Sequence, residues 1–272
     1  MLMAIKGYLM NRATKVVCGI LIFGAIGYVA SFFVPIPASW TGDSVNFHWT
    51  LANSVLYTLL HIGAAILLLI GVTAYKAALR AAYARIALGI VLVGAGLAQV
   101  VMLNIFGLIQ TPWVQYGGVM LPFVVAGISI YSGVRSMAKL IHVASPLARL
   151  SVVIPLLLVS LTVVALLPHS SSPLPELYFD ISNAISVWDV VLYAASFGLV
   201  LHIKNHSGAY YTESMAWLAV GLMGSVVITC IVLLTTFITG QESSGYLVDS
   251  IVIIGGILYL KAGHSFAKTK EL

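Results

Sequence analysis

Charge is what this chain has least of. Lys, Arg, Asp and Glu make up only 8% of its 272 residues, whereas 61% of the residues are hydrophobic. Soluble domains carry about 25% charged residues, so this chain cannot cover a water-exposed surface of ordinary composition. The 13 Lys and Arg residues are scattered over short segments, which argues against nucleic acid as a partner. The lipid bilayer is therefore the expected surrounding.

Cysteines and soluble-enzyme motifs are also scarce. Cys18 and Cys230 each lie inside an apolar stretch without a CxxC neighbour, so neither a disulfide nor a zinc site is expected. The sequence contains no GxSxG, HExxH or Walker loop, and no DxxxD pair that would hold magnesium diphosphate. These absences favour a non-catalytic membrane subunit over an enzyme.

Long apolar stretches are what the chain has in abundance. A helix that crosses a bilayer needs roughly 20 apolar residues. Eight stretches meet this requirement, at about 16–34, 51–74, 86–108, 114–134, 150–168, 183–203, 214–238 and 246–262. The sequence therefore predicts an all-α, polytopic membrane protein with eight transmembrane helices.

The basic residues predict the orientation of these helices. They fall before the first stretch, in every second connection and after the last stretch, and the other four connections contain no Lys or Arg. Cytoplasmic loops carry an excess of Lys and Arg. We therefore expect a multi-pass protein of the cell membrane with its N-terminus and its C-terminus in the cytoplasm.

An internal repeat accompanies this pattern. A shift of 130 residues places Asn53 on Asn183 and Gly94 on Gly224, and a shift of 129 places GISIYSGVRSMAK (127–139) on GILYLKAGHSFAK (256–268) with five identities. Each half has an even number of predicted helices, so the halves point the same way and are related by an axis along the membrane normal. The pattern predicts two four-helix units, 1–145 and 146–272.

His61 lies near the middle of the second apolar stretch. Ionisable groups at membrane depth are costly and are functional candidates by default. An imidazole here could ligate haem iron, relay protons, hold a quinone carbonyl or bond to a neighbouring helix. The other six His residues lie in predicted outer loops or near the inner surface. Haem with two His ligands is therefore not the expected cofactor.

Asp189 is the sharper candidate. It follows Trp188 inside the sixth stretch, where loss of hydration favours the proton-carrying form of a carboxyl, and its repeat counterpart is Leu59. Asp249 lies at comparable depth. Two carboxyls near the outer face predict a proton or cation site or a site for a quinol head group, although both could instead cap or hydrate helix ends.

The predicted ligand-binding residues are thus Asp189, Trp188, Asp249, His61 and the amide Asn53. No catalytic residue and no metal ligand is predicted.

Two families resemble this chain in part. The stretch LLHIGAA (59–65) is similar to the His motif in the second helix of haem A synthases, which also contain two four-helix units. The matching positions of helices four, six and eight here have no His, and the Glu that precedes the family's His is absent. This resemblance implies a degenerate haem-handling protein.

The layout also resembles the quinol-interacting anchors of the polysulfide-reductase type, which bind quinone near the outer face without haem.

Three functional hypotheses follow. The first is an integral membrane subunit of a respiratory or other redox complex, which anchors membrane or peripheral subunits and binds a quinone or another lipid-soluble molecule beside Asp189. The second is a small-solute or ion transporter with parallel repeats, and the third is the haem-handling protein. Transporters often break helices at their binding sites. Pro122 and Pro155 do not correspond between the halves, so the sequence favours the first hypothesis.

Overall fold

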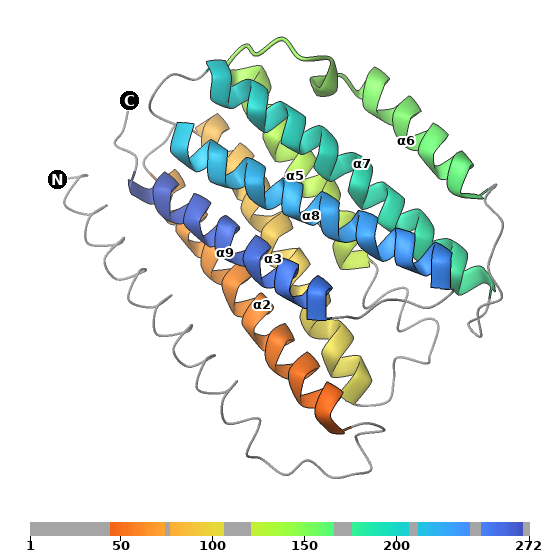
Figure 1. The fold of residues 1–272 in the computed structure, drawn as a ribbon. Coiled ribbons are helices and arrows are strands. Elements are labelled where there is room, and N and C mark those ends of the chain that lie inside the picture. The colour runs from red at the N-terminus through yellow and green to blue at the C-terminus, as the bar shows by residue number, and fades with distance from the viewer. Residues whose placement is uncertain are drawn as a thin grey trace.

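The computed structural model describes residues 44–73, 77–105, 121–165, 176–206, 212–239 and 246–268. Every regular element in these ranges is a helix (Figure 1), which confirms the all-α prediction for this part of the chain. The elements are α2 (Ser44–Val72), α3 (Ala77–Ile105), α5 (Leu121–Leu140), the 3-10 helix η4 (Pro146–Ala148), α6 (Leu150–Ala165), α7 (Glu176–His206), α8 (Thr212–Thr239) and α9 (Tyr246–Lys268).

Several of these helices have the length and composition of membrane spans. Five carry a stretch that is long and apolar enough to cross a bilayer, at Val55–Val72, Ala77–Gln99, Leu121–Leu140, Asn183–His206 and Glu213–Ile231. A sixth apolar stretch, Leu150–Val163, is shorter. These helices are those expected of a multi-pass membrane protein. The first predicted span, 16–34, lies outside the described residues, so the total of eight stays a prediction.

Two helices begin well before the apolar stretches from which they were predicted. α3 begins at Ala77 rather than near 86, because its first turns are rich in Ala, the strongest helix former. α7 begins at Glu176 rather than near 183. Hydropathy measures the part of a helix that suits lipid, whereas the helix itself continues into the interface. As a result Asp189 lies near the middle of α7 rather than close to its start.

Six helices form a closed ring. Each packs against the next in the order α2, α3, α5, α7, α8 and α9, and α9 packs against α2 to close the ring. α6 stands outside the ring and packs on α7 (Figure 1). The connection from α5 to α6, where the predicted boundary at 145 falls, is held by Tyr131, whose hydroxyl donates to the Leu147 carbonyl at 2.8 Å.

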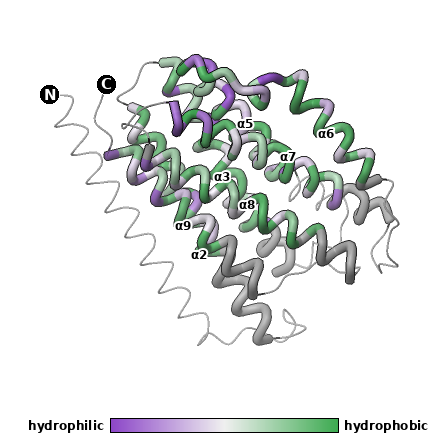
Figure 2. Tube along the Cα trace, turned by 45° about the horizontal axis from the view of Figure 1, so that its top comes forward, coloured by the Kyte–Doolittle hydropathy of each residue, from purple (hydrophilic) through white to green (hydrophobic). Residues whose placement is uncertain are grey.

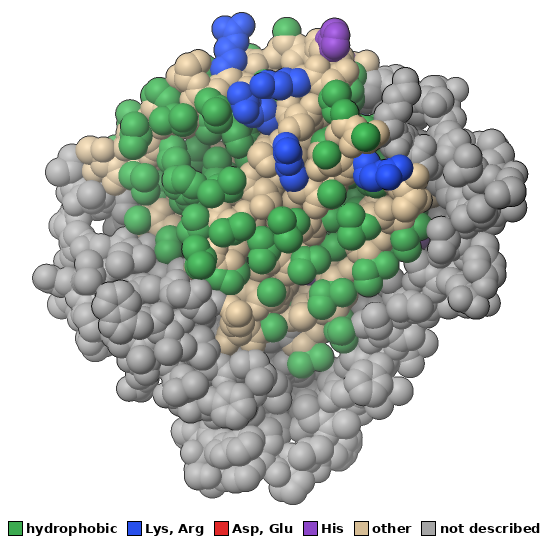
Figure 3. All heavy atoms as spheres, turned by 180° about the vertical axis from the view of Figure 1, so that it is seen from behind, with side chains coloured by type: hydrophobic (Ala, Val, Ile, Leu, Met, Phe, Trp, Pro, Cys, Tyr) green, Lys and Arg blue, Asp and Glu red, His purple; other side chains and the backbone are tan. Residues whose placement is uncertain are grey.

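One end of the ring is basic. The middle of the helices is hydrophobic (Figure 2), and the Lys and Arg side chains gather toward one end of the face seen in Figure 3. This end holds the start of α3, with Arg80 and Arg85, and the last turns of α5 and α7, with Lys139 and Lys204. α2, α5 and α7 end at this end of the ring, and α3 and α8 begin there (Figure 1).

Just inside the basic end lies a fully packed layer. All six ring helices contribute a large side chain that is completely or almost completely buried, and we call this set the inner layer: Leu68, Tyr83, Met137, Ile203, Met215 and Phe266. The rings of Tyr83 and Phe266 are in contact, tilted by 32° with centroids 3.9 Å apart. Phe266 also fills the space beside Gly71, so that no side chain larger than hydrogen fits there. The inner layer therefore closes this end of the ring.

Candidate functional site

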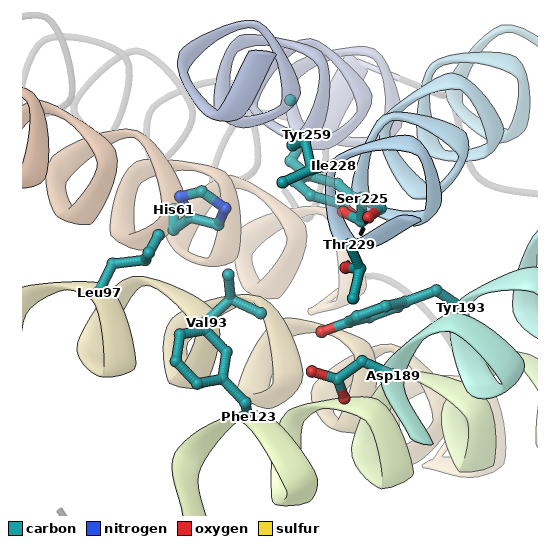
Figure 4. Close-up of a pocket in the computed structure, with 11 residues that line it drawn as sticks. His61, Val93, Leu97, Phe123, Asp189, Tyr193, Ser225, Ile228, Thr229 and Tyr259 are labelled. Atoms are coloured by element: carbon teal, nitrogen blue, oxygen red, sulfur yellow. Dashed lines mark hydrogen bonds between the residues drawn. The ribbon is translucent and has the colours of Figure 1, made fainter. Parts of the chain in front are cut away.

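A cavity of about 110 Å³ lies among the six ring helices (Figure 4). Along each helix its lining residues lie further from the basic end than the residue of the inner layer. All six ring helices line it. The polar lining residues are His61, Asp189, Tyr193, Ser225, Thr229 and Tyr259. The apolar ones are Val93, Leu97, Phe123, Ile228 and Gly255. Among the described residues no Lys or Arg lines the cavity. A small, mixed polar and aromatic chamber thus occupies the centre of an otherwise apolar bundle.

His61 is held in one orientation and one tautomer. Its Nδ1 lies 2.7 Å from the Tyr57 carbonyl one turn earlier in α2. A carbonyl can only accept, so Nδ1 carries the proton and, in the neutral ring, Nε2 keeps a lone pair. The side chain is only 2% exposed, and its ring faces the cavity (Figure 4). Nε2 has no hydrogen-bond partner among the described residues and is available to a ligand.

Two glycines make room for this imidazole. A Cβ on Gly94 of α3 would lie 2.9 Å from the His61 Cβ, and a Cβ on Gly256 of α9 would lie 3.4 Å from the His61 Cε1. The Tyr259 ring lies next to the imidazole at a centroid distance of 5.8 Å. His61 is therefore wedged between its two neighbouring helices, and its position depends on both glycines.

Asp189 projects from α7 on another side of the cavity and is 7% exposed. Its Oδ1 is buried without a hydrogen-bond partner among the described residues. That oxygen faces Gly127 of α5, where an added Cβ would lie 3.1 Å away. A carboxylate buried without a counter-charge is costly. The group therefore needs either a proton or a bound cation to neutralise it.

A short hydroxyl chain joins α8 to α9 at the cavity wall. Thr229 donates to the Ser225 carbonyl at 2.9 Å, and Ser225 can donate to the Gly221 carbonyl at 3.3 Å. The Ser225 and Tyr259 hydroxyl oxygens lie 2.8 Å apart. Either hydroxyl can donate in this pair, since Ser225 can turn its hydrogen to Gly221 or to Tyr259. At least two of the three hydroxyl hydrogens are thus committed within the protein.

Both halves of the chain build this site in a similar way. Gly127, where α5 approaches α7, and Gly256, where α9 approaches α2, are the residues that the 129-residue shift aligns. Gly127 lies beside Asp189, and Gly256 lies beside Leu60 and His61. The cavity therefore sits between the two predicted units, with His61 contributed by the first and Asp189 by the second.

The structure brings two of the five predicted site residues together. His61 and Asp189 line one cavity, a relation that the sequence did not predict. Trp188 does not line it; the indole packs half-buried on the hydrophobic core, and its Nε1 has no partner among the described residues. Asn53 and Asp249 belong to α2 and α9, but their side chains lie outside the description, so their roles stay predictions.

Four polar lining residues were missed by the sequence analysis. Tyr193 follows Asp189 by four positions, and Thr229 follows Ser225 by four. This spacing places each pair on one face of its helix, and it is the signal that could have identified them. Tyr259 is also polar, but only the packing of α9 against α8 reveals its role.

Comparison with known proteins finds no match among family models, characterised proteins or solved structures. The geometry of the cavity is therefore the basis for assigning a function.

Proposed function

We propose that this protein is a membrane carrier that binds a small polar solute in the central cavity and moves it across the bilayer. The observation that carries the proposal is the position of the cavity, with His61 from one half and Asp189 from the other. Carriers built from repeats hold their substrates at the repeat interface, and one half rocks against the other around that site. The second of the three sequence hypotheses is thus the one that the geometry favours.

The dimensions of the cavity support a small solute over a quinone. An engineered apolar cavity that binds benzene measures about 150 Å³, whereas this cavity measures about 110 Å³. A quinone head group is a substituted six-membered ring, and a haem macrocycle is larger still. Both are larger than the space that the described lining surrounds. The polar lining also suits a solute that forms several hydrogen bonds.

The proposal includes the predicted topology of eight spans in two parallel units, with both termini in the cytoplasm. The order of helices in the ring supports it, because α2, α3 and α5 are followed by α7, α8 and α9 in the order that a duplication would produce. Single cysteines at Ser171 and Ser244 should react with an impermeant reagent added outside cells. A cysteine at Ser136 should not, and outside access there would contradict the orientation.

Transport requires the inner layer to open. Tyr83, Phe266 and their neighbours now separate the cavity from the basic end. A carrier must pass through a second state in which these side chains part, whereas a subunit with a fixed ligand site need not. Access to the cavity from the basic end therefore distinguishes the carrier from the redox-subunit hypothesis.

This access can be measured without knowing the solute. Thr229→Cys, in a chain whose native Cys18 and Cys230 are replaced by Ser and Ala, places one thiol on the cavity wall. A charged, impermeant thiol reagent is applied to right-side-out and to inverted vesicles. We expect modification from both sides, since a carrier exposes its site to each side in turn.

Val159→Cys is the matched control. Val159 lies on α6 and is 61% exposed on the apolar outside of the bundle, where a charged reagent cannot reach it from water. If Thr229→Cys reacts from one side only, or from neither, the carrier proposal fails. A fixed site in a membrane subunit is then the better account.

A further inference from the structure

We propose that the cavity selects a small ammonium-type cation, either the ammonium ion or a short primary amine in its protonated form. This inference rests on the proposed carrier function, because it names the class of solute that the same site takes.

Most of the hydrogen-bonding groups on the cavity wall that can still bind a ligand are acceptors. The Thr229 hydrogen is committed to the Ser225 carbonyl, and the Ser225 and Tyr259 hydroxyls share one hydrogen bond, so these three oxygens present more lone pairs than free hydrogens. His61 uses its Nδ1 hydrogen on the Tyr57 carbonyl and presents Nε2. Asp189 adds carboxylate oxygens once it has lost its proton. The Tyr193 hydroxyl adds a donor to the described lining. A ligand that matches this wall must itself donate several hydrogen bonds.

The charge of the site also favours a cation. Asp189 supplies the negative charge, and no Lys or Arg lines the cavity among the described residues. The other titratable groups facing the cavity are His61 on α2, Tyr193 on α7 and Tyr259 on α9, while the described lining residues of α3, α5 and α8 include none. A cation is therefore the ligand that leaves the occupied site without an uncompensated charge.

Asp189 can be neutralised by a proton or by the ammonium ion, but by only one of them at a time. Binding is then an exchange: the carboxyl loses its proton to water, and the carboxylate accepts a hydrogen bond from the N–H of the cation. One positive charge enters the cavity and one leaves. This exchange couples binding of the solute to release of a proton.

Aromatic and apolar surfaces complete the site. Phe123, Tyr193 and Tyr259 line the cavity, and the face of an aromatic ring attracts a cation within about 6 Å of its centre. A bare alkali ion prefers a shell of oxygen ligands that replaces its water, whereas this wall mixes a few oxygens with rings, aliphatic groups and one imidazole. Among the described residues no three His, Cys, Asp or Glu side chains are arranged to hold a metal ion. An N–H cation with a short apolar tail fits the lining better.

Binding of radiolabelled methylammonium to the purified full-length protein in nanodiscs tests the inference. Ammonium chloride should displace the label, whereas sodium chloride and tetramethylammonium chloride at equal ionic strength should not, because neither cation has an N–H. Binding should release about one proton per methylammonium in weakly buffered solution, since a single carboxyl is exchanged. Equal displacement by sodium would overturn the assignment to ammonium.

Three variants connect the binding to the site. Asp189→Asn should weaken methylammonium binding by about 10-fold or more and abolish proton release, because a charge-assisted bond is lost. Thr229→Val should weaken it by about 3- to 10-fold through loss of one acceptor. Thr162→Val makes the same change on α6, where the hydroxyl bonds only to the Leu158 carbonyl, and should have no effect. Unchanged binding in a correctly folded Thr229→Val variant would show that methylammonium does not bind in this cavity.

Failure of this inference and failure of the carrier proposal give different results. If methylammonium does not bind while Thr229→Cys still reacts from both sides of the membrane, the protein is a carrier and the ammonium assignment is wrong. If methylammonium binds but the thiol reacts from one side only, the ligand class stands and transport does not.

Discussion

The two halves of the ring share a scaffold and differ in chemistry. α2, α3 and α5 follow one another as α7, α8 and α9 do, and the aligned glycines Gly127 and Gly256 mark the two places where the halves meet. The polar groups do not repeat. His61 aligns with Val191, and Asp189 aligns with Leu59, at a shift of 130 residues. The first half therefore supplies His61 and the second half supplies Asp189, and both side chains line one shared cavity rather than two separate ones.

The same asymmetry extends to packing. Gly94 and Gly224 are aligned at the same shift, and they would be interchangeable if the halves were equivalent. A Cβ on Gly94 would press on His61 at 2.9 Å, whereas a Cβ on Gly224 would meet nothing within 4 Å. The first half is thus packed closely around His61 at Gly94, whereas the second half leaves space beside the aligned Gly224. Substitutions at aligned positions can test this difference directly.

The largest effect is expected at His61. His61→Ala removes a buried side chain that touches α3 and α9 and leaves a void beside the existing cavity. We expect a loss of about 2–4 kcal/mol in the free energy of unfolding, the range for a large side chain truncated to Ala, measured from unfolding curves in detergent. Val191→Ala, the aligned substitution, should cost about 1–2 kcal/mol, because fewer atoms are removed. Equal losses at the two positions would show that the halves are equally packed.

The amino-acid sequence predicted the class of fold and each of the two central polar residues. An apolar stretch of spanning length predicts a membrane helix, whichever other helices pack against it. A single His61 or Asp189 in such a stretch is conspicuous because burying it is costly. These features are local, so they can be recognised without knowing which helices touch.

The shared cavity could not be predicted in the same way. It exists because α9 packs against α2 and α5 packs against α7, and these contacts join residues that are far apart in the chain. Tyr193, Ser225 and Thr229 did not stand out, since hydroxyl residues are easily accommodated in membrane helices through bonds to their own backbone, as Thr229 shows. The starts of α3 and α7 were placed too late because hydropathy marks the lipid-facing length only.

An intermediate effect is expected at the aligned glycines. Gly94→Ala brings a methyl group within 2.9 Å of the His61 Cβ, so α2 and α3 must move apart or the imidazole must shift. Overpacking of this kind costs about 1–3 kcal/mol. Gly224→Ala has open space and should be neutral or stabilising by up to about 1 kcal/mol, the difference in helix propensity. Thermal unfolding of the two variants side by side measures the contrast, and a matched loss in both would contradict the described fit around His61.

The smallest effect on stability is expected at Asp189, where replacement should raise the free energy of unfolding slightly rather than lower it. Asp189→Leu gives α7 the residue that its aligned helix carries at Leu59, and the two side chains have nearly the same branched shape. The buried Oδ1 has no partner among the described residues, and removing a buried unsatisfied polar atom relieves part of its desolvation cost, on the order of 1 kcal/mol. We therefore expect the variant to unfold at a slightly higher temperature than the unaltered protein while losing methylammonium binding altogether. Such a result would indicate that the Asp189 carboxyl serves ligand binding, because it lowers the stability of the unliganded protein. A clear loss of stability in Asp189→Leu would instead mean that the carboxyl already has a structural partner, and Asp189 would then belong to the scaffold rather than to the site.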